Sequence, residues 1–333
     1  MRALLALVPL AATLALGCAS PAWKPVPMTV LPAMPAYEPP PQTAPVARKR
    51  SPKPPEPRAS AMSGELPPEL GPIGRVELCK ERACSLGAIV PASMLAEKKA
   101  AGGTAPGAPI AVWTTRFASA GQTLSTPRDA RVDVYGVVLR GEVKIRGVEQ
   151  ATSIVQPTWR AFRASGGGLA IRATKPDTLV MLAVATDGAP VLEVAVQSEK
   201  NVVWRERPKP IETRDLSASP DLAWMGGAFH ARLGFEDGRA SLEVLLGSRD
   251  APVKPHTHDG SWEALAVARG GGSFSSTEGD AAGAHAVRDG DVVLVPKGVR
   301  HAWTPAGESP LVAIQLYAPP GPEQRFKELG HAR

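Results

Sequence analysis

Short apolar runs separated by turn residues dominate the chain from about residue 108 onward. Each run has four to eight residues rich in Val, Ile, Leu and Ala, and each is closed by Gly, Pro or Asp. Runs of this length, bounded by turn residues, are typical of β-strands. The pattern therefore predicts an all-β body.

The predicted strands form two similar halves of eight, and eight short strands fit a double-sheet jelly roll. In the first half they are expected at 111–117, 132–139, 142–145, 152–155, 160–163, 169–172, 179–185 and 191–196. In the second half they are expected at 228–235, 242–246, 263–268, 273–275, 284–287, 292–295, 301–304 and 311–317. Residues 205–220 are read as the joint, and short helices are expected at 91–99 and 322–329.

The N-terminus has the pattern of an export signal. Arg2 precedes an apolar stretch at 4–16, which is too short for a comfortable membrane span. Gly17-Cys18 follows directly and resembles the lipobox of bacterial lipoproteins, in which the cysteine is acylated. The resemblance implies a lipid anchor on Cys18 and a periplasm-facing place in the bacterial cell envelope, with the outer membrane favoured. An ordinary signal peptide with an incidental cysteine is the alternative.

Proline dominates the next segment, with 16 prolines between Pro21 and Pro72. Such a composition buries too little apolar surface to offset chain entropy and favours extended spacers. The domain plan is therefore a signal peptide at 1–18, a disordered linker at 19–75, and two barrel domains at 76–205 and 206–333.

Composition narrows the function further. Hydrophobic residues make up 44% of the 333 residues, and 35 prolines with 32 glycines argue against long helical bundles. The net charge of +6 is not gathered into a basic face, so nucleic acid is not an expected partner. Past the N-terminus no apolar run approaches the length of a bilayer span.

Two cysteines other than Cys18 are present, Cys79 and Cys84. In an exported protein a short-loop disulfide between them is the favoured interpretation, and two free thiols are the alternative. No further zinc-type ligands lie beside them.

Residues 255–263, Pro-His-Thr-His-Asp-Gly-Ser-Trp-Glu, hold the most informative pattern. Side chains two apart on a strand share one face, so His256 and His258 can hold a common ion. The turn after them allows Glu263 to reach the same point. Residues 290–300 contain a further strand bracketed by turns. They place His301 on a separate strand, which can approach the same point.

These residues resemble the two motifs of the cupin superfamily. The first motif matches as His256 and His258, four residues, Glu263, six residues and Gly270. The second matches as Gly290, five residues, Pro296, Gly298, two residues and His301. The resemblance covers about residues 225–320 and implies that the three histidines and the glutamate bind a divalent metal inside the barrel.

Three imidazoles and one carboxylate suit a transition metal such as iron, manganese, nickel, copper or zinc rather than calcium or magnesium. The sequence does not distinguish among these ions. His230, His285 and His331 lack partners at ligand spacing and are interpreted as structural or exposed.

The first half contains no histidine between residues 108 and 200, so it cannot hold the same site. Alignment of the halves places Val134 opposite Glu263 and Leu169 opposite His301. The first half is therefore interpreted as a degenerate cupin, with packing, homodimer contact or ligand binding as its open roles.

In cupins generally such metal sites serve dioxygenases, isomerases, decarboxylases and lyases. Trp262, Trp303 and Arg300 are candidate pocket residues, with core packing or a solvated turn as the alternatives, and Lys297 or Arg300 could meet an anionic substrate. No second carboxylate is identified as an acid or base. The sequence favours a lipid-anchored bicupin that binds a metal and a small molecule, with a metal-dependent dioxygenase or isomerase as the alternative.

Overall fold

The structure is a computed structural model of the chain. It describes residues 63–68, 70, 77–79, 83–85, 102–103, 107–126, 128–147, 152–191, 210–276, 283–306, 308–329 and 331–332. The predicted signal peptide with Cys18, most of the predicted linker and the helix predicted at 91–99 lie outside these residues. Within the described ranges, none of the helices has the length and hydrophobicity needed to cross a membrane.

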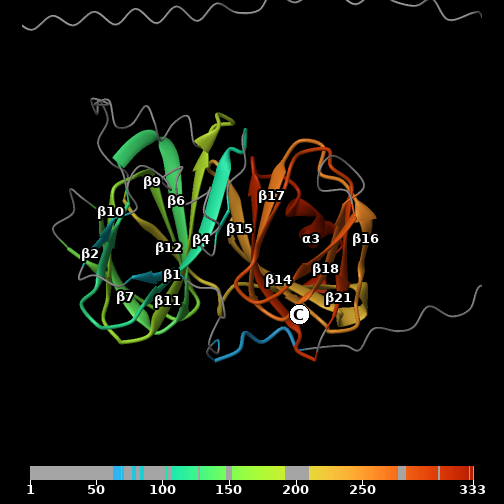
Figure 1. Ribbon diagram of the computed structural model, residues 1–333, viewed down its shortest axis with the longest axis horizontal. Coiled ribbons are helices and arrows are strands. Elements are labelled where there is room, and N and C mark those ends of the chain that lie inside the picture. The colour runs from blue at the N-terminus through green and yellow to red at the C-terminus, as the bar shows by residue number, and fades with distance from the viewer. Residues whose placement is uncertain are drawn as a thin grey trace, which may run out of the picture. The chain divides into compact units, whose positions relative to one another are not determined.

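The N-terminal barrel, residues 77–215, is built from two sheets (Figure 1). One sheet has the order β1-β4-β11-β6-β9-β12, with β3 beside β4, and the other has the order β2-β5-β10-β7-β8. The strands are β1 (Glu77–Cys79), β2 (Ala83–Ser85), β3 (Gly102–Gly103), β4 (Ile110–Phe117), β5 (Thr123–Ser125), β6 (Arg128–Arg140), β7 (Glu142–Gly147), β8 (Ile154–Pro157), β9 (Arg160–Gly167), β10 (Leu169–Ala173), β11 (Thr178–Thr186) and β12 (Glu212–Asp215).

The C-terminal barrel, residues 221–332, repeats this plan. Its sheets have the orders β20-β17-β22-β15-β14-β13-β23 and β16-β21-β18-β19. The elements are β13 (Asp221–Trp224), a 3₁₀ turn η2 (Met225–Gly227), β14 (Phe229–Phe235), β15 (Ser241–Gly247), β16 (Val253–His256), β17 (Trp262–Arg269), β18 (Gly272–Ser276), β19 (Gly283–Val287), β20 (Val292–Val295), β21 (His301–Pro305), β22 (Leu311–Ala318), α3 (Gln324–Leu329) and β23 (His331–Ala332).

The all-β jelly-roll prediction is confirmed. Every strand predicted between residues 111 and 185 and between 228 and 317 overlaps an observed strand. The strand predicted at 191–196 falls outside the described residues after its first position. The helix predicted at 322–329 is α3. Part of the predicted joint is itself a strand, because β12 pairs with β9 of the N-terminal barrel.

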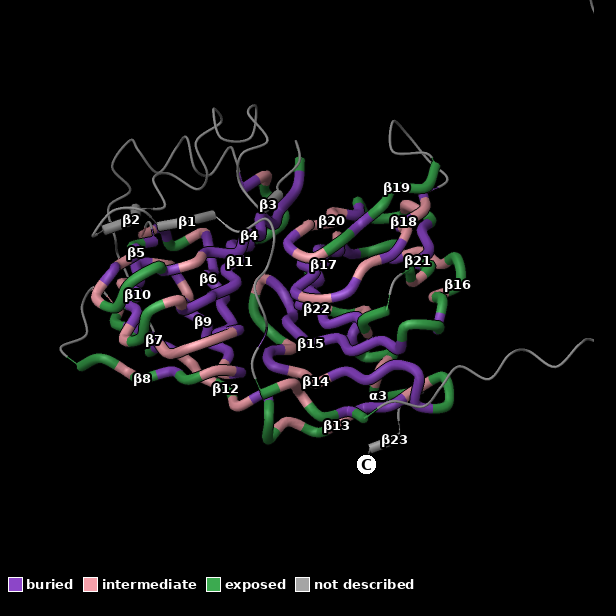
Figure 2. Tube along the Cα trace, turned by 60° about the horizontal axis from the view of Figure 1, so that its bottom comes forward, coloured by how far each residue is buried: buried purple, intermediate pink, exposed green. Residues whose placement is uncertain are grey.

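The two barrels share a hydrophobic core. Strands β4 and β11 of the N-terminal barrel pack against β17 and β22 of the C-terminal barrel. Buried side chains from both barrels, including Val112, Met181, Leu242 and Ile314, belong to one cluster. Figure 2 shows these strands as buried over most of their length. This apolar contact joins the barrels into one unit.

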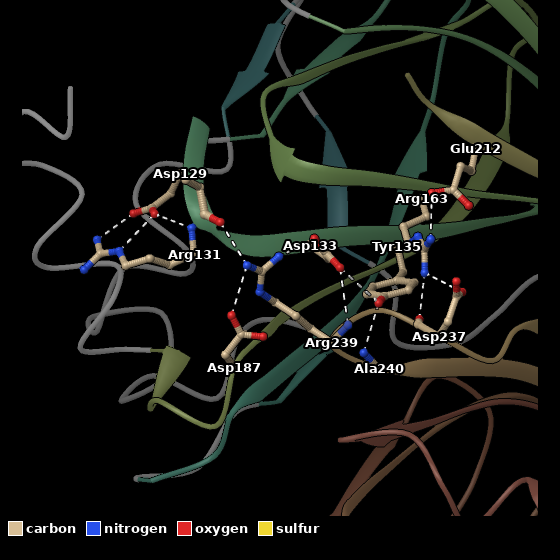
Figure 3. Close-up of polar contacts among 11 residues, drawn as sticks. Asp129, Arg131, Asp133, Tyr135, Arg163, Asp187, Glu212, Asp237, Arg239 and Ala240 are labelled. Carbon is tan, nitrogen blue, oxygen red and sulfur yellow. Dashed lines mark hydrogen bonds and ion pairs between the residues drawn. The ribbon is translucent and has the colours of Figure 1, made fainter. Parts of the chain in front are cut away.

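Ion pairs and hydrogen bonds flank that core (Figure 3). Arg239 pairs with Asp133 at 2.6 Å, and Arg163 pairs with Asp237 at 2.7 Å. The hydroxyl of buried Tyr135 accepts a hydrogen bond from a backbone N–H of the C-terminal barrel, at 2.9 Å. These contacts link the barrels through groups that sequence analysis did not single out.

The predicted linker, 19–75, is too long at its C-terminal end. Leu70 is 1% exposed and lies in the core shared by the barrels. The indole N–H of Trp159 donates to the carbonyl of Pro67 at 2.6 Å, and Arg232 donates to the carbonyl of Gly64 at 2.9 Å. The segment was assigned to the linker because its many prolines dominate its average composition. That average does not reveal a few apolar side chains that dock on the barrels.

One strand register relates the two barrels. Pairing of β6 with β11 is shifted by a bulge just before Arg140, and pairing of β17 with β22 is shifted just before Arg269. Counting back from these bulges places Val134 at the position of Glu263. Pairing in the second sheets places Leu169 at the position of His301. Both correspondences inferred from the sequence are confirmed.

Candidate metal centre

The four predicted ligands come from both sheets of the C-terminal barrel. His256 ends β16 and lies directly across from His301, the first residue of β21. His258 lies in the loop after β16. The backbone carbonyl of His258 accepts a hydrogen bond from the N–H of Gly298 at 2.9 Å. Glu263 is the second residue of β17, in the opposing sheet. The fold therefore brings all four side chains to one place.

Their ligand atoms all lie within 4.8 Å of one another. The Nε2 atoms of His258 and His301 lie 3.2 and 3.0 Å from the same carboxylate oxygen, Oε2 of Glu263. The rings of His256 and His301 are closest, with centroids 4.2 Å apart. This is a group that could hold a metal ion.

Burial provides a test of that fit. His258, Glu263 and His301 are only 5%, 5% and 3% exposed, whereas His256 is half-buried. Nε2 of His258, Nε2 of His301 and Oε2 of Glu263 are buried and make no hydrogen bond of normal geometry. Buried polar atoms are nearly always paired, so three unpaired donor atoms aimed at one point fit a bound cation. The donor set suits a divalent transition metal.

Backbone carbonyls orient two of the imidazoles. Nδ1 of His256 lies 3.0 Å from the carbonyl of Lys254, and Nδ1 of His301 lies 2.9 Å from the carbonyl of Val299. A carbonyl only accepts, so Nδ1 carries the proton in both rings and Nε2 keeps its lone pair. Metal-binding histidines are commonly held in this way.

Electrostatics within the group favours the charge states that a metal needs at Glu263 and His256, whereas in the absence of a metal it favours protonation of His301. Burial acts to raise the pKa of Glu263, but His258 and His301 outweigh it and hold that pKa well below its usual range. Burial, with a smaller effect of His301, lowers the pKa of His256 to about 4. Burial also acts to lower the pKa of His301, yet Glu263 raises it overall. At neutral pH the carboxylate is charged and His256 is neutral.

Sequence analysis missed three polar residues inside the same barrel. Gln315 donates a hydrogen bond from Nε2 to Oε1 of Glu263 and so fixes the carboxylate. Tyr317 packs edge-on against His258, with ring centroids 4.9 Å apart. Glu243 is 0% exposed, and neither of its carboxylate oxygens has a hydrogen-bond partner among the described residues. The strand pattern held a signal, because all three interrupt otherwise apolar strands.

Glu243 is a second buried carboxylate on the sheet that carries Glu263, and the sequence analysis did not single it out. Burial, followed by the charges of Glu323, Glu263 and Glu236, raises the pKa of Glu243 well above its usual range. The side chain therefore favours the neutral carboxylic acid.

The N-terminal barrel supplies an internal comparison for this polar lining. By strand pairing, the counterparts of Glu263, His301, Tyr317, Gln315 and Glu243 are, in that order, Val134, Leu169, Val184, Leu182 and Trp113. All five counterparts belong to one buried apolar cluster. The fold does not require polar residues at these positions.

The other predicted pocket residues lie in different surroundings. Trp262 packs against the core shared by the barrels, on the face of β17 opposite to Glu263. Trp303 is buried within the C-terminal barrel core, two residues after His301. Arg300 is exposed. The part of these three residues in a pocket stays a prediction.

Cys79 and Cys84 lie in β1 and β2, which belong to different sheets, and their disulfide stays a prediction. His230 is fully buried and its Nδ1 lies 2.8 Å from Asp221, in agreement with a structural role. His285 is exposed.

Comparison with known proteins bears on the same part of the chain. Residues 243–317 match the family model of the cupin domain. This part of the C-terminal barrel is therefore similar to cupin domains. Two solved structures of oxalate decarboxylase from Bacillus subtilis resemble the protein: an S161A mutant (12% identity, TM-score 0.48, 64% of this chain and 70% of that chain) and the enzyme at pH 4.6 (13%, 0.48, 64% and 69%). At these identities the likeness concerns the fold alone. No curated protein sequence matches the chain.

Proposed function

We propose that the cupin domain binds one divalent transition metal and that this metal centre binds a small molecule. The metal would be held by four ligands: His256, His258, Glu263 and His301. Iron, manganese, nickel, copper and zinc all suit this donor set. Four protein ligands in a six-coordinate shell leave two positions for an exogenous ligand.

The observation that carries the proposal is the convergence of buried, unpaired donor atoms. Nε2 of His258, Nε2 of His301 and Oε2 of Glu263 have no ordinary hydrogen bonds. The two nitrogens lie only 3.2 and 3.0 Å from that one oxygen, and a cation bound between them would give all three buried atoms a partner of good geometry. The apolar counterparts in the N-terminal barrel support a specific role for these residues.

Elemental analysis of protein purified from its native envelope tests metal binding. We expect stoichiometric transition metal in the wild type and none in the double variant His256→Ala, His301→Ala. His285→Ala removes an exposed histidine and is the matched control, which should keep its metal. The circular dichroism of the double variant should stay that of a β protein, because apolar strands hold the barrel. Equal metal content in the wild type and the double variant would refute the proposal.

A metal-dependent enzyme of the dioxygenase or isomerase type is the second candidate. Glu243 favours it, because a buried neutral carboxyl in the metal-binding barrel can donate a proton to a bound molecule. Assays of oxygen uptake and isomer formation, with iron or manganese restored, separate the candidates. A thermal shift caused by a ligand without turnover supports binding alone.

We further propose that the protein is anchored in the bacterial cell envelope by acyl chains on Cys18. Each buried CH₂ of an acyl chain contributes about 0.8 kcal/mol of membrane affinity. Mass spectrometry of the N-terminal peptide should find the acylated cysteine as the first residue. A mature chain that starts elsewhere, or carries a free Cys18 thiol, would contradict this proposal.

A further inference from the structure

One hairpin of the C-terminal barrel is held by side chains of the N-terminal barrel (Figure 3). Its loop is residues 236–240, between β14 and β15. Nη1 of Arg163 donates to both the carbonyl and the carboxylate of Asp237 at 2.7 Å, and Arg239 pairs with Asp133 at 2.6 Å. Arg163 and Asp133 are only 6% and 2% exposed. Each pair therefore has one buried partner, and salt screens such pairs less than fully exposed ones.

The hairpin also fits closely against the N-terminal barrel. Gly238 has a φ of +87°, and a Cβ atom there would lie 2.6 Å from Nη1 of Arg163 and 2.9 Å from the hydroxyl oxygen of Tyr135. Before the loop, the ring centroid of Phe235 lies 5.3 Å from Cζ of Arg163 and 6.1 Å from the ring centroid of Tyr135. After it, the N–H of Ala240 donates to the hydroxyl of Tyr135. The N-terminal barrel thus contacts the hairpin along its length.

The same hairpin contacts the C-terminal segment 321–329. Directly after the hairpin loop, Oγ of Ser241 donates to Oε2 of Glu323 at 3.0 Å, and both residues are 0% exposed. Within the loop, Glu236 pairs with Lys327 of α3. The segment is therefore joined to the hairpin by one fully buried contact and one partly exposed contact.

This segment lies against the candidate metal centre. Nη2 of Arg325, in α3, lies 2.7 Å from Nδ1 of His258. Phe326 stacks on Trp224 with centroids 4.8 Å apart. The helix has only six residues, Gln324–Leu329, and a helix this short is not stable alone in water. Its conformation therefore depends on its contacts with the rest of the protein.

We propose that the N-terminal barrel is a scaffold for the metal-binding barrel: through the hairpin at 236–240 it holds α3 against the candidate metal centre, with Arg163 as the main positioning residue. The inference goes beyond the proposed function and does not rest on it, because none of these contacts requires a bound metal. It gives the barrel that contains no metal ligands a definite role.

Amide hydrogen exchange of the full chain tests this inference, because it measures local opening of α3. EDTA in every sample keeps the protein metal-free. The test variant Arg163→Met keeps a long unbranched side chain and removes the contacts with Asp237. Arg160→Met is the matched control, since Arg160 lies on the same strand, β9, and pairs at 2.9 Å with Asp215 of β12, outside the hairpin.

We expect the amides of α3 to exchange at least threefold faster in Arg163→Met than in the wild type. In Arg160→Met they should keep the wild-type rate. Asp237→Ala should accelerate the same amides at least twofold, and this change threatens folding little because the Asp237 side chain is 76% exposed. Amides of β18, in the other sheet of that barrel, should keep their wild-type rate in all three variants.

A second background separates positioning from a general loss of stability. Ser241→Ala combined with Lys327→Met removes both side-chain contacts between the hairpin and the C-terminal segment. If Arg163 acts on α3 through the hairpin, adding Arg163→Met to this background should accelerate α3 exchange by less than threefold. Residues that act through one shared path are non-additive in this way.

Three results would overturn the inference. The first is acceleration of α3 exchange by less than threefold in Arg163→Met. The second is an equal acceleration in Arg160→Met, and the third is acceleration of threefold or more when Arg163→Met is added to the uncoupled background. If Arg163→Met does not fold, Asp237→Ala takes its place, and acceleration by less than twofold then has the same meaning.

Discussion

Glu243 offers the sharpest test of how much the buried polar residues of the C-terminal barrel lower its free energy of unfolding. Its carboxyl is 0% exposed, and both oxygens are buried without a hydrogen-bond partner among the described residues. A buried polar group left unsatisfied costs about 1–3 kcal/mol. Glu243→Met keeps a similar volume and removes the polar atoms, so we expect the free energy of unfolding to rise by about 1–3 kcal/mol near pH 4, where the carboxyl is largely neutral in both states, and by more at neutral pH.

The same reasoning fixes the sign of the pH dependence. Burial and neighbouring carboxylates raise the pKa of Glu243 in the folded protein, whereas an unfolded glutamate has a pKa of about 4.3. The folded state therefore binds this proton more tightly. The stability that proton binding contributes is present at low pH and is lost progressively as the pH rises above the pKa of the unfolded glutamate. The loss has a limiting slope of about 1.4 kcal/mol per pH unit.

Urea unfolding followed by circular dichroism, at pH 5, 6, 7 and 8, measures both effects. EDTA in every sample removes any contribution from bound metal. The advantage of Glu243→Met over the wild type should grow from pH 5 to pH 8. Glu308→Gln, which removes an exposed carboxylate, should show no such growth. If Glu243→Met gains no stability at pH 8, or if its gain is independent of pH, the carboxyl is satisfied in solution and the reasoning is wrong.

Two further substitutions test the packing that positions the site. Gly270→Ala should destabilise the protein by about 2–4 kcal/mol in urea, because φ is +89° and a Cβ atom would lie 2.7 Å from the carbonyl oxygen of Pro310; a loss under 0.5 kcal/mol would mean that this turn relaxes. Leu70→Ala should cost about 2–5 kcal/mol, since the side chain is 1% exposed in the core shared by the barrels. An unchanged urea midpoint would show that residues 63–70 do not dock in solution.

The ligand group was predictable because its information is local. Turn residues such as Gly290 and Gly298 bracket a strand, and their spacing determines where His301 enters the barrel. The pair His256 and His258 needs only the two-residue repeat of an extended chain. The same locality explains why most strands could be placed from apolar runs alone.

The rest of the site depends on tertiary contacts that no short pattern encodes. Gln315 reaches Glu263, and Glu243 lies on the same face of the sheet, because β22 lies between β15 and β17. Arg325 reaches His258 only because α3 returns to the barrel from 67 residues further along the chain. Leu70 was hidden for a similar reason, since burial of a single side chain leaves no trace in a proline-rich average.

The two barrels together separate what the fold needs from what the site needs. At five matched inward positions the N-terminal barrel has apolar side chains and the C-terminal barrel has polar or charged ones. Both barrels share strand order and bulge position, so the polar set is not required for folding. Burial raises the pKa of Glu243 and of Tyr317 well above their usual ranges. Ionisation of either side chain would therefore destabilise the folded state. Because apolar residues fill the matched positions of the N-terminal barrel, we infer that this polar set serves the candidate metal centre rather than the fold.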